Sequence, residues 1–282
     1  MKICVVGLGL IGGSICLSLK RAGYTVDGYN RSQAPLEYCL EKGIIANAAK
    51  SFESYDLVFV ALPPEATLKF INGTAFKNGA IVSDICGVKR YIINGITNKN
   101  IRYIGTHPMA GKEVSTVFNA CENLFDGASM IITPDENSDM RALEIIKTLT
   151  RDMGFGTIIE CSADIHDKKI SYTSQLAHIV ANAYVKDSEI EGCIGFTGGS
   201  FQDMTRIAGV DEGVWSSLYL ANAENLNDRI SALILSLEKV KSAISSGDKA
   251  ALEQVLKEGR QSFESEKKNI AGEKIKVTRL GK

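Results

Sequence analysis

The stretch CVVGLGLIGG, residues 4–13, decides how this chain begins to fold. The β-branched run over residues 3–6 has the composition of a buried parallel strand, and the glycines after it match GxGxxG at the start of an amphipathic segment. Gly7 suits the tight turn, Gly9 the close approach of backbone amides to a pyrophosphate, and Gly12 the close packing of helix and strand. The order strand, glycine turn and helix therefore predicts a dinucleotide-binding βαβ unit, with the diphosphate at the helix N-terminus.

The same stretch follows Met1 and Lys2, and a lysine before an apolar run is also how a secretory signal begins. Four glycines interrupt what would be the helical apolar centre of such a signal, however, and no small-residue cleavage site clearly follows it. We therefore interpret the segment as part of the fold and not as a targeting signal.

The end of the second predicted strand, residues 24–29, is where a dinucleotide fold reads the adenosine ribose. Asn30, Arg31 and Ser32 stand there, and none is an acid that would bind the 2′-hydroxyl of NAD and repel a 2′-phosphate. A guanidinium beside a hydroxyl and an amide suits a phosphate dianion. The sequence therefore favours NADP over NAD. The alternative is that Arg31 is a solvated loop residue and Asn30 serves NAD.

The composition of the 282 residues, 45% hydrophobic and 23% charged, is that of a soluble globular protein with room for two domains. A formal net charge of -1 removes the electrostatic argument for a nucleic-acid partner. Seven cysteines without a CxxC pair predict neither a disulfide framework nor a zinc site, and they fit the reduced thiols of the cytoplasm. No apolar segment reaches the length of a membrane span. The basic residues from Lys274 to Arg279 are interpreted as a solvated chain end.

Strand and helix signals alternate through the first half of the chain, which predicts a mostly parallel sheet with helices on both faces. The further strands are expected at residues 56–62, 80–84, 101–105, 128–133 and 157–161. Ligands of such folds lie beyond the carboxyl ends of the strands. The segments 62–64, 84–89 and 106–111 follow strand ends, so we expect them to form the walls of one cleft.

The pattern changes after residue 162, where strand signals give way to helical apolar spacing over residues 165–190, 214–245 and 249–270. The apolar stripe from Leu218 to Val240 is typical of a core or a subunit interface. The sequence therefore predicts an α/β protein with an N-terminal Rossmann dinucleotide-binding domain (residues 1–162) and a C-terminal all-helical dimerisation domain (residues 163–282).

The chain has three histidines, and His107 stands out because its segment THPMAG follows a strand end that faces the expected cofactor. Hydride removal from an alcohol needs a group that accepts the hydroxyl proton, and a neutral imidazole has a suitable pKa. His107 is therefore the candidate base. His166 lies near a helix start, where we expect a capping or packing role. His178 lies on a helix, either as a packed core histidine or as a ligand-binding one.

Several motifs together resemble those of the prephenate/arogenate dehydrogenase family of tyrosine biosynthesis. They are GLGLIGGS, VSDICGVK, GTHPMAGKE, LFDGASMIITP, HDKKISYTSQLAHIVA and GGSFQDMTRIAG, followed by VW and Asn222. The matches run in family order from Lys2 to Asn222, and their combination is far more specific than any single one.

The resemblance implies oxidative decarboxylation of prephenate to 4-hydroxyphenylpyruvate with reduction of NAD(P). It places the catalytic histidine at His107, a carboxylate-binding arginine at Arg206 and a substrate-binding histidine at His178. Lys112 and Glu113 border the expected cleft and are further candidates for contact with the substrate side chain. The apolar helical stripe predicts a homodimer, and the cysteine usage a cytoplasmic location. The expected cofactor-binding residues are Gly7, Gly9, Leu10, Ile11, Gly12, Asn30, Arg31, Ser32, Leu62, Pro63 and Cys86.

Two positions depart from the family pattern. The family commonly has a serine where this chain has Gly87, a candidate substrate-binding position, and the serine hydroxyl helps to hold the substrate hydroxyl and the base. A backbone amide, a water molecule or the Cys86 thiol could take its place, although a thiol is a weak donor. Ala177 stands where the family helix usually has a proline, and we expect a modest effect on helix geometry.

Three alternatives stay open at this point. The substrate could be arogenate, giving tyrosine directly. The chain could be a catalytically inactive NADP-binding sensor of the same fold, as the glycine at 87 suggests. It could also be another β-hydroxyacid-type dehydrogenase, which shares the architecture but normally uses a lysine as base.

Overall fold

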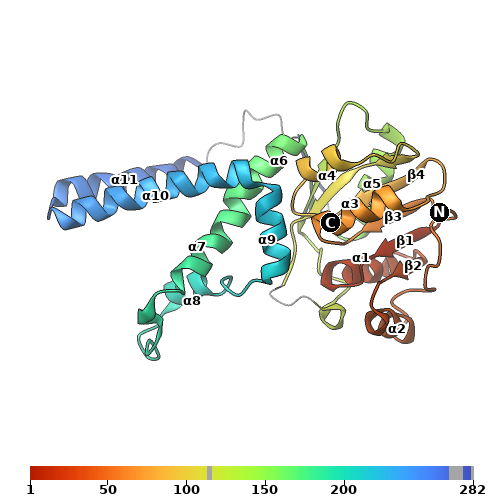
Figure 1. Ribbon diagram of the computed structural model, residues 1–282, viewed down its shortest axis with the longest axis horizontal. Coiled ribbons are helices and arrows are strands. Elements are labelled where there is room, and N and C mark those ends of the chain that lie inside the picture. The colour runs from red at the N-terminus through yellow and green to blue at the C-terminus, as the bar shows by residue number, and fades with distance from the viewer. Residues whose placement is uncertain (113–115, 267–275, 281–282) are drawn as a thin grey trace.

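The computed structural model describes residues 1–112, 116–266 and 276–280, and these form two domains side by side (Figure 1). The expected α/β architecture, a Rossmann domain followed by a helical domain, is confirmed. The sheets occupy the right of Figure 1, and a long helical hairpin projects to the left.

Five parallel strands form the first sheet, in the order β2-β1-β3-β4-β5. They are β1 (Ile3–Val6), β2 (Val26–Tyr29), β3 (Leu57–Val60), β4 (Ala80–Asp84) and β5 (Ile101–Tyr103). The helices of this domain are α1 (Leu10–Arg21), α2 (Gln33–Glu41), α3 (Pro64–Gly73), α4 (Arg90–Gly95) and α5 (Met140–Asp152), with a 3₁₀ turn η1 (Val117–Asn119).

Successive side chains of a strand point to opposite faces, and the two faces of this sheet bury two apolar clusters. Ile3 and Val5 of β1 belong to the cluster that includes side chains of α1 and α5. Cys4 and Val6 belong to the other cluster, with Ile71 of α3. Because both faces are covered, the strands read as continuous apolar runs without alternation.

A second sheet differs from the parallel expectation. It has the order β6-β7-β8-β9, formed by β6 (Gly105–Pro108), β7 (Ser129–Thr133), β8 (Thr157–Glu160) and β9 (Lys276–Arg279). β6 runs antiparallel to β7, and β9 runs antiparallel to β8. Residues 276–279 are mostly exposed, as expected of a solvated chain end, but they also form a strand that pairs with β8, and Lys276 lies 3.4 Å from the Glu160 carboxylate.

The second domain is helical over the described residues. It contains α6 (Ala163–Ile170), a π-helical segment η2 (Ser171–Leu176), α7 (Ala177–Tyr184), a 3₁₀ turn η3 (Ser188–Ile190), α8 (Gly199–Thr205), α9 (Glu212–Ala221), α10 (Ala223–Ser245) and α11 (Lys249–Glu266). The helix expected over 214–245 is broken at Asn222. The Asn222 amide turns inward and donates to the Asp167 carbonyl and the Gln175 side chain.

A buried ion pair fixes the loop after β4. The side chains of Lys89 and Asp84 are fully buried, and the Lys89 ammonium donates to the Asp84 carboxylate and, at 2.6 Å, to the Thr106 carbonyl. The Tyr103 hydroxyl also donates to Asp84. A buried charge is tolerated when it is paired and hydrogen-bonded. The pair therefore ties β4, β5 and β6 together at the end of the sheet.

Replacing Lys89 by Met should lower the free energy of unfolding by about 3–5 kcal/mol, because the Asp84 carboxylate would stay buried without its cation. Urea denaturation measures the change. Lys77→Met is the matched control, since Lys77 forms an ion pair of 2.6 Å with Asp56 at the surface; it should cost about 1 kcal/mol or less. Equal losses of unfolding free energy in the two variants would show that burial does not determine how much the Lys89–Asp84 pair contributes to stability.

Candidate active site

The glycine turn after β1 has the close backbone packing that a dinucleotide cradle requires. Gly7 has φ +91°, and a Cβ at this residue would lie 2.2 Å from the Ala61 carbonyl oxygen. A Cβ at Gly12 would lie 1.9 Å from the Gly7 carbonyl oxygen. α1 then begins after Gly9 without a side-chain cap, so the amides of its first turn are available to an anion. The residues present therefore fit a pyrophosphate group.

A cavity of about 310 Å³ lies over this turn. Its lining residues are Gly7, Leu8, Gly9, Asn30, Pro35, Ala61, Leu62, Thr116, Val117 and Phe118. Four of the expected cofactor residues thus line one cavity. Leu10, Ile11 and Gly12 form the first turn of α1 beside it, while Ser32 and Pro63 stand at the N-termini of α2 and α3.

The Asn30 side chain holds the loop at the end of β2. Its Oδ1 accepts from the Leu8 amide at 3.0 Å, and its Nδ2 donates to the Ser32 carbonyl at 3.0 Å. Arg31 and Ser32 are exposed at the same edge. Asn30 therefore shapes the pocket through the backbone, and Arg31 supplies the cationic side chain of this edge.

The Cys86 thiol is bonded to the region after β3. It is buried, donates to the Leu62 carbonyl at 3.2 Å and lies 3.4 Å from the Thr67 hydroxyl. Burial raises its pKa to about 12, so it stays a thiol. The suggestion that Cys86 replaces the missing serine hydroxyl was therefore wrong. Cys86 instead ties the loop after β4 to the loop after β3.

Two histidines and an aspartate form a chain of hydrogen bonds between the two domains. His107 Nδ1 lies 2.9 Å from His166 Nε2, and His166 Nδ1 lies 2.7 Å from the Asp167 carboxylate. Asp167 also accepts from the backbone amides of Lys89 and Arg90, at 2.8 and 2.9 Å. The expected capping role of His166 was wrong, since Ser162 caps α6. His166 is packed in the interior, as the alternative predicted, and is also bonded to His107.

These contacts select the tautomers. An ionised carboxylate only accepts, so the proton of neutral His166 lies on Nδ1 and leaves Nε2 as an acceptor. His107 then donates from Nδ1, and its Nε2 carries a free lone pair. The position of a Cβ at Gly87 lies 3.7 Å from this Nε2, so the lone pair opens toward the loop after β4. His107 is thus oriented as a base.

The charges around His107 favour its neutral form. Burial lowers the pKa of His107 well below 6.5, and the proximity of His166 and the Lys89 ammonium lowers it further. Burial also lowers the pKa of His166, although its hydrogen bond to Asp167 opposes that shift. At neutral pH the His107 ring is therefore unprotonated and able to accept a proton.

The helical domain also carries His178, which is linked to the His107 region through α9. His178 Nδ1 donates to the Ile207 carbonyl at 2.9 Å, and its ring lies 3.9 Å from that of Trp215 on α9. Leu218, one turn further along α9, would lie 3.4 Å from a Cβ at Gly87. α9 therefore bridges the His178 group and the His107 group.

The other residues expected to bind the substrate are Arg206, Lys112 and Glu113. Arg206 is exposed at the C-terminus of α8, beside the Ile207 carbonyl that His178 contacts. Lys112 is exposed, with its ammonium 3.3 Å from the Cys121 sulfur. Glu113 lies outside the described residues.

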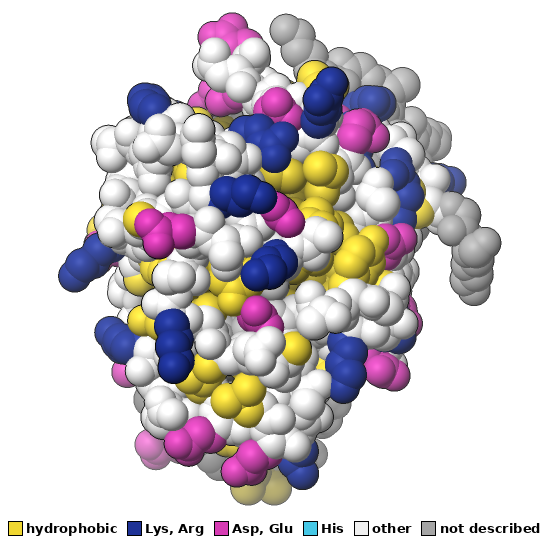
Figure 2. Space-filling model, turned by 90° about the vertical axis from the view of Figure 1, so that its right-hand side faces the viewer, with side chains coloured by type: hydrophobic (Ala, Val, Ile, Leu, Met, Phe, Trp, Pro, Cys, Tyr) yellow, Lys and Arg dark blue, Asp and Glu magenta, His cyan; other side chains and the backbone are white. Residues whose placement is uncertain are grey.

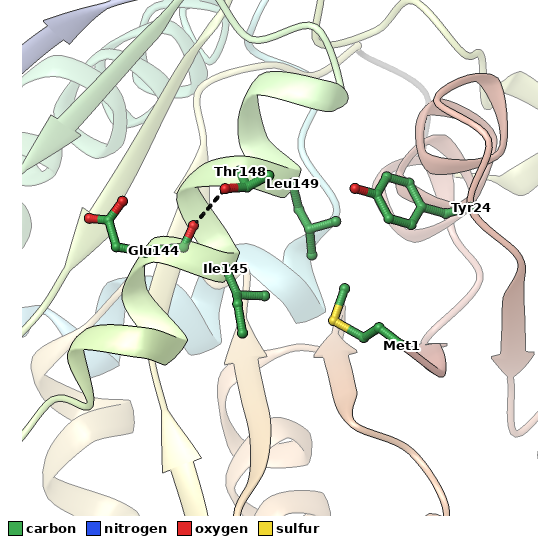
Figure 3. Close-up of a pocket in the computed structure, with 6 residues that line it drawn as sticks. All are labelled: Met1, Tyr24, Glu144, Ile145, Thr148 and Leu149. Carbon is green, nitrogen blue, oxygen red and sulfur yellow. Dashed lines mark hydrogen bonds between the residues drawn. The ribbon is translucent and has the colours of Figure 1, made fainter.

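Another hollow, of about 250 Å³, carries none of the expected site residues. It is lined by Met1, Tyr24, Glu144, Ile145, Thr148 and Leu149. Figure 3 shows α5 on one side and Met1 and Tyr24 on the other, with the Thr148 hydroxyl donating to the carbonyl of Glu144. Its lining is mainly apolar, and Thr148 is satisfied within the helix. The Glu144 carboxylate, the acidic group of this lining, is bonded to the Lys147 ammonium at 3.0 Å.

Cationic and anionic side chains are mixed on the surface, in agreement with the formal net charge of -1. Figure 2 shows the end of the molecule at the right of Figure 1, where Lys and Arg side chains are interspersed with Asp and Glu around a group of hydrophobic side chains. This face has no basic stripe. Within the described part of the chain, no group of His, Cys, Asp and Glu could hold a metal ion, and no helix is long and apolar enough to cross a membrane.

Known proteins resemble most of the chain. Residues 15–159 match the family described as "Prephenate dehydrogenase, nucleotide-binding domain", and residues 162–258 match "Prephenate dehydrogenase, dimerization domain". The Bacillus subtilis prephenate dehydrogenase is 30% identical over 263 residues, covering 87% of this chain and 71% of that protein.

Two solved structures are similar in fold and in sequence. Prephenate dehydrogenase from Aquifex aeolicus, in complex with hydroxyphenyl propionate and NAD+, has a TM-score of 0.80 and 29% identity, covering 94% of this chain and 98% of that one. Synechocystis arogenate dehydrogenase has a TM-score of 0.74 and 25% identity, covering 94% and 99%.

The His107 ring should titrate below pH 6.5 in the native protein, because burial and its cationic surroundings disfavour the imidazolium. Histidine NMR spectra recorded across pH measure this, and the urea-unfolded chain, expected near 6.5, is the internal control. The unfolded chain then binds the proton first, so His107 contributes a loss of stability as the pH falls below 6.5. A native pKa above that of the unfolded chain would contradict the assignment.

Proposed function

Because the chain belongs to the prephenate dehydrogenase family, we propose that it catalyses the oxidative decarboxylation of prephenate to 4-hydroxyphenylpyruvate, with reduction of NAD(P). The observation that carries this proposal is the free Nε2 lone pair of His107. It opens toward Gly87 at the carboxyl end of β4 and is backed by His166 and Asp167.

The proposed chemistry needs one base and one hydride acceptor. A nicotinamide held over the glycine turn would supply the acceptor for the hydride from the ring carbon that bears the hydroxyl group. His107 Nε2 accepts the hydroxyl proton as the hydride leaves. The carbon–carboxylate bond on the opposite ring carbon then breaks, CO2 leaves with the ring becoming aromatic, and the proton returns from His107 to the phenolate oxygen. The hydrogen bond between His107 Nδ1 and His166 Nε2 keeps the His107 ring in place between these two events.

Two groups are proposed to bind the anionic ends of the substrate. Arg206 offers a planar guanidinium suited to a carboxylate. The hydrogen bond from His178 to the Ile207 carbonyl holds that histidine beside the Arg206 segment, and Trp215 packs on its ring. We assign Arg206 to the ring carboxylate and His178 to the side-chain end. Lys112 and Glu113 are proposed at the same end.

We rank NADP before NAD as the preferred cofactor. The support is the exposed Arg31 at the end of β2, beside Ser32 and without an acidic neighbour in that loop. An aspartate or glutamate at this place would repel a 2′-phosphate. The A. aeolicus relative binds NAD+, so the two proteins would differ at this edge.

Arogenate is the second candidate substrate, since it differs from prephenate by an ammonium group in place of a keto group, and the Synechocystis relative is an arogenate dehydrogenase. An inactive NADP-binding protein is the third candidate, favoured by Gly87 and by the hydrogen bond that engages the Cys86 thiol with the Leu62 carbonyl. The alternative that uses a lysine as base is not supported, because Lys89, the lysine of the loop beside His107, is buried against Asp84.

We also infer that the protein is a cytoplasmic homodimer. The helical domain matches a dimerization domain, and its α10–α11 hairpin exposes Leu235, Leu237 and Leu256, each about 60% exposed. Large apolar side chains exposed in this way are typical of an interface. All seven cysteines are free thiols, as expected in a reducing compartment.

Initial rates of reduction of NADP and NAD, each with prephenate and with arogenate, test the proposal, read as absorbance of the reduced nicotinamide. We expect turnover with prephenate and NADP.

His107→Asn should lower kcat by about 10²–10⁴-fold and leave dinucleotide binding unchanged, because only the base is lost. His178→Asn is the matched control and should raise KM for the substrate more than it lowers kcat. Wild-type protein that binds NADP but turns over neither substrate would support the inactive sensor instead.

Arg31→Ala should weaken NADP binding at least tenfold and change NAD binding little, because a charge-assisted contact is lost from the 2′-phosphate alone. Isothermal titration with the two cofactors measures the difference. Lys20→Ala is the matched control, since Lys20 is also an exposed cation and its ammonium is bonded to the Gly43 carbonyl. Parallel losses for NAD and NADP would contradict the assignment of Arg31 to the phosphate.

A further inference from the structure

An aromatic ring stands exposed at the mouth of the dinucleotide cavity. The side chain of Phe118 lines that cavity and is 59% exposed, whereas its neighbour Val117 is 2% exposed. Exposing a large apolar ring to water is unfavourable unless another surface covers it. Tyr38 of α2 contacts the ring edge-on, with centroids 4.7 Å apart, and so supports it without burying it. The exposed remainder of Phe118 is therefore available to a ligand.

The segment that carries Phe118, residues 116–121, is anchored firmly to α1. A Cβ at Gly13 would lie 2.8 Å from Val117 Cγ2 and 3.0 Å from Ala120 Cβ, so the close approach depends on the absence of a side chain at Gly13. The Cys121 amide donates to the Ser14 hydroxyl at 3.1 Å. The anchoring fixes Phe118 over the glycine turn, and the ring does not need to be ordered when a ligand binds.

The position of Phe118 in the sheet order identifies which half of a dinucleotide it meets. The glycine turn follows β1, and the cavity extends from it to Asn30 and Pro35, which follow β2. In this fold the end of β2 holds the adenosine ribose. The candidate base lies toward the opposite edge, because His107 faces the loop after β4 and the order of strands is β2-β1-β3-β4. Phe118 is therefore on the adenosine side.

We propose that Phe118 stacks on the adenine ring of the bound dinucleotide and, with Pro35, closes the adenosine half of the cavity. This inference rests on the proposed function, since it requires that the cavity binds a dinucleotide. An adenine offers a flat π-face of the size that an exposed phenyl ring covers, and stacking of this kind tolerates either NAD or NADP. The ring thus sets affinity for the nucleotide, and Arg31 sets the choice between the two cofactors.

Titration calorimetry with NADP+, NAD+, ADP-ribose and nicotinamide mononucleotide tests the proposal. Phe118→Ala should raise Kd about tenfold for both cofactors and for ADP-ribose, and leave nicotinamide mononucleotide unchanged. Phe118→Tyr keeps the ring and should bind as the wild type does. Phe118→Leu keeps an apolar side chain without a ring and should lose most of the affinity that Phe118→Ala loses.

Met140→Ala is the matched control, because Met140 is also exposed, at 66%, but stands on α5 outside the cavity; its affinities should equal those of the wild type. Thermal unfolding checks that each variant is folded. Unchanged cofactor binding by Phe118→Ala overturns the proposal. Wild-type affinity in Phe118→Leu also overturns it, because an apolar side chain without a ring would then be sufficient. A wild-type protein that binds neither dinucleotide overturns the proposed function itself, a result distinguishable from the failure of Phe118 alone.

Discussion

The carboxylate of Asp167 holds the two domains and the candidate base in one arrangement. It accepts hydrogen bonds from the backbone amides of Lys89 and Arg90 in the first domain and from the His166 ring in its own helix. Hydrogen bonds to an ionised acceptor are about twice as strong as neutral ones. The Lys89 backbone and the Lys89 side chain act in different directions: the amide binds Asp167, and the ammonium binds Asp84 and the Thr106 carbonyl. One residue thus connects the helical domain to the strand that carries His107.

The fold was largely predictable, because its signals are local. A buried strand, a glycine turn and an amphipathic helix follow one another within residues 3–21, and each reports its own structure through composition and spacing. The pairing of β9 with β8 was not predictable on these grounds. The segment 276–279 is short and basic. Its place in the sheet depends on the open edge of β8, which is far away in the sequence. The break at Asn222 likewise depends on the buried partners Asp167 and Gln175.

Some residues of the candidate site were also predictable from the sequence, and others were not. His107 was expected from its segment, but the expected position after a strand end was wrong, because His107 lies within β6 and pairs with Ile131 of β7. Gly87 was noticed from its departure from a known pattern. The role of His166 was not, since a histidine at a helix start has an ordinary explanation and its contact with His107 joins two domains. One signal was present in the sequence: His166 directly precedes an aspartate, and a carboxylate beside a histidine is a common way to fix a tautomer. Phe118 gave no signal, because its exposure is visible only when the segment is folded.

The return of β9 to the sheet makes the helical domain an insertion within the first domain. The strand order places residues 157–160 beside residues 276–279, so β9 lies outside the helical domain expected over residues 163–282, and helices α6 to α11 lie between the two strands in sequence. The ladder between β8 and β9 is therefore a contact of high sequence separation, and closing so large a loop has an entropic cost that local elements do not bear. During synthesis the first sheet can form early, whereas the edge of the second sheet stays open until the helices have been made. The helical domain must consequently fold while the edge of β8 is still unpaired.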